Sequence, residues 1–493
     1  MRRVLTAFLF ASAPVVGCTF HVDGVGPAAS HDAGNPATDF AGVDLTGVDL
    51  APPPPADLAG LCNGGPTAAC DSDGVTLVVC SGSVPTSTVC TDGCSIEGTP
   101  HCKQFDPGGV AEASDYQQGG LVDVVIPEDA TAVFNTDTGQ INIPSRAGGA
   151  GLIGGIAFRQ ATQPNTTVSV GIFSMKSLTL SANAVIDVVG SRPLSIVTSG
   201  DIVISGTIDV LGSCQAGSPI AGGYAGGAPK QDGGNPGGGM GGGRPGLHPN
   251  FGAGGGGGGG YGEIGGDGAT TSVNATSGGP GGVRFGDLSG NDPVLLGGSG
   301  GASGAGGVAS NGGAGGSGGG AVQLASNGGI TLGSSAIIQA SGCHGSPGEG
   351  IPTAGGGGGS GGSVLVEART LQVNSGAIIA ANGGAGAGGG AGDVGEDGHD
   401  DADQAEGGAG GTGVSLGTMG GNGGHTGSLA GDPGVVPTAA NTQGGGGGGG
   451  VGRIALKSKT GTVAMSGAIL SPQVGETSQG HPSPATVGSV QFK

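Results

Sequence analysis

The stretch from residue 194 to residue 212 reads L-S-I-V-T-S-G-D-I-V-I-S-G-T-I-D-V-L-G, and the chain repeats this pattern. Further copies lie at 322–342, 364–383 and 454–471, separated by glycine-rich stretches. In each copy the apolar residues lie two apart, which is the period of a β-strand with one buried face. The repeat therefore predicts short strands joined by small turn residues.

Aligned copies place like residues in like columns. The columns are Ile202, Ile330, Leu371 and Val463; Ile204, Leu332, Val373 and Met465; Ile208, Ile338, Ile379 and Leu470; and Leu194, Val322, Val364 and Ile454. A degenerate copy upstream places Leu178, Leu180 and Ile186 in the same columns. Stacked columns predict one turn of a parallel β-helix per copy. Antiparallel hairpins in a sandwich are the alternative, but they favour Asn-Gly or Asp-Gly turns and independent strand patterns.

The predicted fold class is therefore all-β: a short right-handed parallel β-helix with long glycine-rich insertions, preceded by a small disulfide module. Of 493 residues 124 are glycine, with 11 Phe, 3 Tyr and no Trp, which argues against an ordinary globular core. The formal net charge of −21 and the scarcity of aromatic residues argue against nucleic acid as a partner. The same scarcity weakens a sugar-binding interpretation.

The N-terminus has the pattern of a secretory signal over residues 1–17, with a basic start and a short apolar run. The residues V-V-G-C at 15–18 resemble the lipobox of bacterial lipoproteins. That resemblance implies cleavage before Cys18 and lipid on its sulfur and amino group. Thr19 stands where many such bacteria place an inner-membrane retention Asp, so the expected location is the outer membrane. An ordinary secreted protein with an unpaired thiol is the alternative.

Two further segments precede the repeats. Residues 18–60 are rich in Asp, Pro and Ala and predict a solvated tether. Residues 61–104 predict a three-disulfide module formed by Cys62, Cys70, Cys80, Cys90, Cys94 and Cys102, with fifteen pairings open. The module is either a stapled spacer or a protein-binding knob.

The rest of the chain divides into a β-rich capping region with a first unit at 110–190 and the repeats with their insertions at 191–493. V-Q-F at 490–492 echoes A-V-Q-L at 321–324 and predicts a last strand. Insertions at 213–320, 343–362 and 384–452 all follow the third strand of a unit, so they should project from one edge. Many follow Gly-Gly-x triplets, whose period suits packed polyglycine II helices. Disorder is the alternative, since glycine loses the most entropy on ordering.

The chain resembles the glycine-rich surface lipoproteins of soil deltaproteobacteria. The features that carry the resemblance are the lipobox, the Asp-Pro tether, the cysteine module and the G-D-I-V-I-S-G-T-I-D units with Gly-Gly-x insertions. The insertions alone are similar to the PGRS region of mycobacterial PE-PGRS proteins, although the PE domain is absent. The resemblance implies a cell-surface location rather than an activity.

Asp187 and Asp209 occupy equivalent positions in two consecutive units, outside the apolar columns. Parallel strands lie about 4.8 Å apart, so the two carboxylates suit cation binding or an acid pair. Two observations argue against catalysis or cation binding by this pair. The column continues without an acid through Gln339, Ala380 and Ser471, and Arg192 is near enough in sequence to neutralise the pair. A solvated or paired surface is the simplest interpretation.

Residues 393–406 concentrate acids around His399, and the candidate metal ligands are Glu396, Asp397, Asp400, Asp401 and Asp403. The spacing matches neither an EF-hand nor a glycine-rich calcium repeat, so weak calcium binding competes with a solvated charge run. Cys214 and Cys343 each follow a third strand, and stacking of their units would bring them together as a disulfide.

The function predicted from sequence is a lipid-anchored, surface-exposed outer-membrane protein with a structural or adhesive, non-enzymatic role. Its expected partners are the membrane, through the lipid, and either envelope polysaccharide or other surface proteins. No cofactor is expected, with calcium as the one ion in question. Two alternatives stay open: a polysaccharide-degrading β-helix enzyme using Asp187 and Asp209, and a cation-dependent ligand-binding surface protein.

Overall fold

In the computed structural model, residues 62, 67–211, 214, 220–247, 252–271, 278–412, 416–437, 442–478 and 480–493 are described. The predicted signal, the tether and Cys18 lie outside these residues. The described chain is nearly all β, and its one α-helix is α1, Ala113–Tyr116. The all-β prediction is confirmed.

The cysteine module is a small antiparallel unit. Strands β1 (Ala68–Cys70), β2 (Thr76–Ser81) and β3 (Val84–Val89) form one sheet, and β4 (Cys94–Ser95) pairs with β5 (His101–Cys102). Of the fifteen pairings that the sequence left open, the structure has Cys62–Cys80, Cys70–Cys94 and Cys90–Cys102. All six predicted cysteines are therefore in disulfides.

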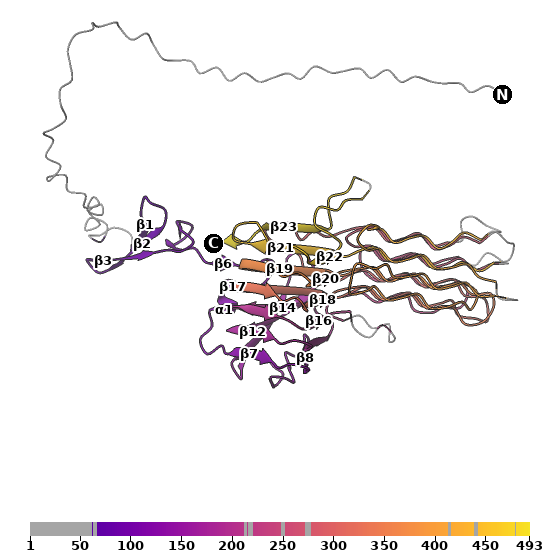
Figure 1. Cartoon of the computed structure of the whole chain (residues 1–493), viewed down its shortest axis with the longest axis horizontal. Helices are drawn as coiled ribbons and strands as arrows, with labels where there is room; N and C mark the ends of the chain where they lie inside the picture. The colour runs from indigo at the N-terminus through magenta and orange to yellow at the C-terminus, as the bar shows by residue number, and fades with distance from the viewer. Residues whose placement is uncertain are drawn as a thin grey trace, which may run out of the picture.

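The repeats build two long sheets of mainly parallel strands (Figure 1). The larger sheet runs through β11 (Ser169–Met175), β14 (Leu194–Thr198), β17 (Ala321–Leu332), β19 (Ser363–Val373), β21 (Arg453–Ser458) and β23 (Ala485–Ser489). On it β12 (Ser177–Leu180) pairs with β15 (Ile202–Ile204), which pairs with the second half of β17. The other sheet contains β8 (Thr131–Asn135), β13 (Val185–Val189), β16 (Thr207–Asp209), β18 (Ile337–Gln339), β20 (Ile378–Ala380) and β22 (Ile469–Ser471).

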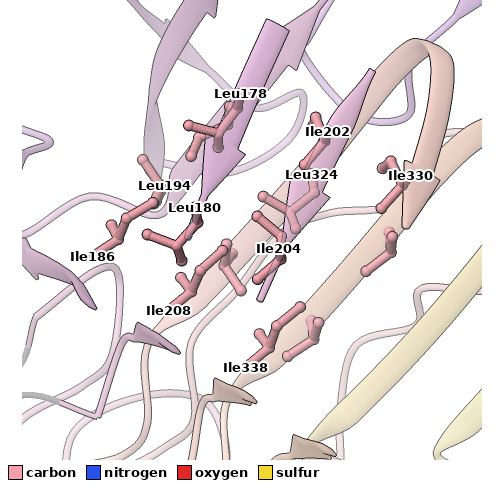
Figure 2. Close-up of a cluster of buried hydrophobic side chains, with 14 of the residues drawn as sticks. Leu178, Leu180, Ile186, Leu194, Ile202, Ile204, Ile208, Leu324, Ile330 and Ile338 are labelled. Carbon is pink, nitrogen blue, oxygen red and sulfur yellow. The ribbon is translucent and has the colours of Figure 1, made fainter. Parts of the chain in front are cut away.

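The strand registers reproduce the predicted columns. Ile208 lies opposite Ile186 on one side and Ile338 on the other, and the column continues through Ile379 and Leu470. These side chains are buried between the two sheets, as Figure 2 shows for the central units. Each enclosed side chain contributes roughly 1.5–3 kcal/mol of transfer free energy, so the aliphatic column is the main stabilising feature of the stack.

The predicted ends of the stack need correction. Part of the expected cap already belongs to the columns, because β7 (Asp123–Ile126) and β8 pair in parallel with β12 and β13. The antiparallel strands there are β9 (Gly151–Ile153) and β10 (Ile156–Thr162), which pairs with β11. At the other end β23 continues the parallel sheet, whereas β24 (Gln491–Phe492) pairs antiparallel with β6 (Phe105–Asp106). The last strand predicted at V-Q-F is therefore present, but it lies outside the parallel stack.

The outer face of the larger sheet is also covered. A second apolar cluster joins Phe105 and Tyr116 of the N-terminal segment to Leu288 and Leu295, which belong to the first insertion. Residues 284–296, here called the strap, therefore cross the sheet rather than joining the glycine-rich segments. The strap was not predicted from sequence, because glycine-rich stretches flank it and 213–320 has the composition of one insertion.

Candidate functional site

The glycine-rich insertions form a single bundle at one corner of the stack. They leave after β16, β18 and β20 and return into β17, β19 and β21, as their common position in the repeat predicts. Figure 1 shows them extending side by side away from the sheets. Because all three project from the same edge, they form one elongated feature.

Backbone hydrogen bonds join the bundle with a period of three residues. Residues 254–260 are central, and their N–H groups donate to three neighbouring segments in rotation. Gly255 and Gly258 donate to Ala269 and Gly266 of the first segment, Gly256 and Gly259 donate to Gly355 and Gly358 of the second, and Gly257 and Gly260 donate to Arg244 and Gly241 of the third. The nitrogen–oxygen distances are all 2.8–3.0 Å.

The carbonyl groups of the same segment accept from three other neighbours. Ala302 and Ala305 donate to Gly257 and Gly254, Gly447 and Gly450 donate to Gly256 and Gly259, and Gly279 and Gly282 donate to Gly255 and Gly258. The central segment therefore has six neighbours, and its backbone groups are satisfied without any apolar core.

Close packing explains why these residues are glycine. For Gly255–Gly260, an added Cβ would lie between 1.9 and 2.5 Å from a neighbouring carbonyl oxygen. No side chain fits at such distances, so an unbroken glycine run marks a segment that is enclosed on all sides. Met240, which is 64% exposed, interrupts the run at 237–243 where that segment reaches solvent.

A disulfide links the first insertion to the second at the base of the bundle. Cys214 of the first insertion is bonded to Cys343 of the second, at a sequence separation of 129. The pairing predicted from the stacking of the two units is therefore present. It fixes the starting points of two insertions relative to each other.

The register places Asp187 opposite Asp209 on neighbouring strands, with Gln339, Ala380 and Ser471 continuing the column. One carboxylate oxygen of Asp209 accepts a hydrogen bond from the N–H of Leu211 at 2.8 Å. Arg192 does not neutralise this pair, because it forms its ion pair with Asp137. The adjacency of the two acids was predictable, and the partner of Arg192 was not.

The acids of 393–406 are distributed over local contacts. Glu396 accepts the N–H of Glu406 and lies 3.3 Å from His399, while Asp401 accepts the N–H of Asp403. Asp400 is exposed. Glu396, His399 and Asp403 line a hollow of about 660 Å³ beside the bundle.

Asp397 contacts His344 of the second insertion rather than the other acids of 393–406. Its Oδ1 lies 2.6 Å from Nδ1 of His344 and accepts the backbone N–H of the same residue. The bond with Asp397 raises the pKa of His344, against the effect of burial. Burial would raise the pKa of Asp397, but the hydrogen bonds from His344 hold it below its usual value.

The two shifts define a pH window for this pair. The raised pKa of His344 stabilises the fold fully below its unfolded value of about 6.5, and this contribution is lost as the pH rises through the folded pKa. The lowered pKa of Asp397 stabilises the fold fully above about 3.9, and this contribution is lost as the pH falls. The contact between the second and third insertions is therefore strongest between about pH 4 and pH 6.5.

The seven acids named as metal candidates do not gather into one cation site. Within the described part of the chain, the one set of three His, Cys or carboxylate ligand atoms within 4.8 Å is Cys214, Cys343 and Asp397. Both of its sulfurs are in the disulfide, so they are not thiolate ligands. Calcium binding stays a prediction from the acidic composition alone.

The cysteine module docks on the repeats through a buried acid that the sequence analysis missed. The side chain of Asp92 is 3% exposed, and its carboxylate lies 2.5 Å from Arg369 and 2.9 Å from Lys459. Burial would raise the pKa of Asp92, but these two cations hold it below its usual value. These two ion pairs hold the cysteine module against the repeats.

Comparisons with known proteins found no family model that matches the chain, and neither a curated protein nor a solved structure is significantly similar to it. In the part of the chain that the structure describes, no helix is both long enough and apolar enough to cross a membrane.

Proposed function

We propose that this chain is a lipid-anchored protein of the outer membrane, displayed on the cell surface, with a structural or adhesive and non-enzymatic role. The observation that carries the proposal is the hydrogen-bonded glycine bundle. Its segments are held by backbone bonds on several sides, so it is a rigid projection that requires few apolar residues. Such a projection suits a spacer or a contact surface at the cell boundary.

We also propose a finer description of the two β-rich parts. The parallel strands are the turns of a short right-handed parallel β-helix, and the glycine-rich segments are polyglycine II helices. The strand registers support the first proposal, and the three-residue rotation of hydrogen-bond partners supports the second. A rigid stack that ends in a rigid bundle transmits force from an anchor to a distant contact.

Anchoring rests on the N-terminal sequence. The lipobox-like V-V-G-C and the acidic tether resemble those of glycine-rich surface lipoproteins. Four disulfides support an oxidising compartment, since stable disulfides are rare in the cytosol. Envelope polysaccharide or other surface proteins are the proposed partners.

The proposal is tested by the N-terminus of the mature protein. Mass spectrometry of the membrane-extracted chain should find Cys18 as the first residue, carrying acyl chains on sulfur and nitrogen. A Cys18→Ser variant should lose these chains and leave the membrane fraction, with a Ser30→Ala variant in the predicted tether as control. Retention of the Cys18→Ser variant in the membrane would refute the lipid anchor.

A further inference from the structure

A hollow lined by two arginines lies where the strap meets the base of the repeats. Its volume is about 430 Å³, within the range of small-molecule sites. Three distant segments form its walls: residues 284–289 of the strap, Arg453 at the start of β21, and residues 481–486 before and within β23. No candidate from the sequence analysis lies in it.

Arg453 is the central group of the hollow. The residue is only 6% exposed, its Nε donates to the carbonyl of Phe285 at 3.0 Å, and its guanidinium lies 5.6 Å from the ring centre of Tyr261. Within the described chain, neither of its terminal nitrogens has a hydrogen bond, yet neither is fully enclosed. A deeply held guanidinium therefore lines the hollow with two terminal nitrogens that have no hydrogen-bond partner in the described chain.

A second guanidinium forms the neighbouring wall. Nη2 of Arg284 donates to the carbonyl of Pro482 at 3.1 Å, and Nη1 lies 3.7 Å from the carboxylate of Glu263 without a hydrogen bond. Together the two arginines make the electrostatic potential of the hollow more positive, although the chain as a whole is strongly acidic. Burial beside Arg284 also lowers the pKa of Arg453, as expected for a cation that lacks a close anion.

The nearby acids already have partners. Glu263 is 1% exposed and accepts hydrogen bonds from Ser478 and from the N–H of Ile264. Asp287 accepts both the N–H and the hydroxyl of Ser289 at 2.8 Å. Neither carboxylate lies within ion-pair distance of Arg453, so the free donors of that residue await an anion from outside the chain.

We infer that this hollow is a binding site for the carboxylate of an acidic saccharide. The planar fork of Arg453 suits a bidentate contact with a carboxylate or another oxyanion. Ser289, Ser483 and Thr486 line the same hollow, and Phe285 adds an apolar wall. The hydroxyls of Ser289 and Ser483 already donate to Asp287 and to the carbonyl of Ala485, so toward a sugar they act as acceptors. The inference rests on the proposed adhesive function and gives it a ligand class, an anionic envelope or matrix polysaccharide.

The test uses the full mature chain and isothermal titration with sodium glucuronate, with glucose and sodium sulfate as separate probes. Glucuronate should bind at one site, and glucose, which lacks the carboxylate, should bind at least about tenfold more weakly. Equal binding of glucuronate and glucose would refute the carboxylate contact. Binding of sulfate without glucuronate would show a simple oxyanion site and overturn the saccharide assignment.

Variants separate ligand binding from folding. Arg453→Gln should weaken glucuronate binding at least about tenfold, whereas Lys230→Gln, which removes an exposed charge outside the hollow, should leave it unchanged. Asp287→Asn removes a competing negative charge and should tighten binding several-fold, which a damaged fold would not do. Unchanged affinity in Arg453→Gln overturns the inference. If that variant does not fold, unchanged affinity in Asp287→Asn overturns it.

Absence of the saccharide site can be distinguished from failure of the proposed surface role. A surface-displayed, acylated protein that does not bind glucuronate removes only the saccharide site. A protein that binds glucuronate but lies inside the outer membrane keeps the site and removes the surface role.

Discussion

Replacement of Gly258 by alanine is the sharpest test of the bundle. The new Cβ would lie 1.9 Å from the carbonyl oxygen of Gly448, where ordinary contacts begin near 3.4 Å. That carbonyl accepts the N–H of Gly266 at 2.8 Å, and Gly266 in turn accepts the N–H of Gly258. The substitution therefore forces apart segments that are joined by hydrogen bonds.

The expected cost follows from these contacts. Overpacking costs about 1–3 kcal/mol, and each backbone hydrogen bond lost costs about 0.5–1.5 kcal/mol more. With one or two bonds broken, Gly258→Ala should lower the free energy of unfolding by about 2–5 kcal/mol. Urea unfolding measures this change, and hydrogen exchange of residues 252–271 shows whether the loss is local.

Gly290→Ala is the matched control. This glycine is exposed in the strap, its φ is not in the left-handed region, and an added Cβ would meet nothing within 4 Å. There alanine should be neutral or stabilise by up to about 1 kcal/mol, because it restricts the unfolded chain. If Gly258→Ala were as stable as Gly290→Ala, the close packing of the central segment would be wrong.

Three further predictions concern the disulfide, the repeats and pH. Replacing Cys214 and Cys343 by serine should lower the urea midpoint, since closing a loop of this length is worth up to about 5 kcal/mol; an unchanged midpoint would show that the bond adds nothing. Ile204→Ala should cost about 2–5 kcal/mol and its neighbour Val203→Ala, 37% exposed, much less, so equal losses would contradict the strand alternation. Raising the pH from 6 to 8.5 should lower the hydrogen-exchange protection of residues 393–398, relative to the intrinsic exchange rate at each pH, in the native chain but not in His344→Gln; the same loss of protection in both would exclude this histidine as the cause.

The repeats were predictable because each strand must alternate and each unit must stack on the next. Those two conditions are enough to align Ile208 with Ile338 and to place the insertions at one corner. The Cys214–Cys343 disulfide followed from the same stacking. In such a fold the pattern along the chain determines the neighbours across it.

The strap and its arginine hollow could not be predicted in this way. Phe285 and Leu288 lie in a stretch without a repeating period, and they are placed by contacts with residues far along the chain. The partner of Asp92 and the pairing of the six cysteines depend on similar tertiary contacts. One available signal was overlooked: the unbroken run at 254–260 already marks an enclosed segment, since positions 255–260 exclude a side chain.

The most direct test of the account is protease treatment of intact cells, with mass spectrometry of the released fragments and of the N-terminus that is retained. A surface-displayed, lipid-anchored protein should shed the region beyond residue 110 while an acylated Cys18 stays with the cells. If nothing is shed until the outer membrane is opened, the bundle faces the periplasm and the surface role is wrong.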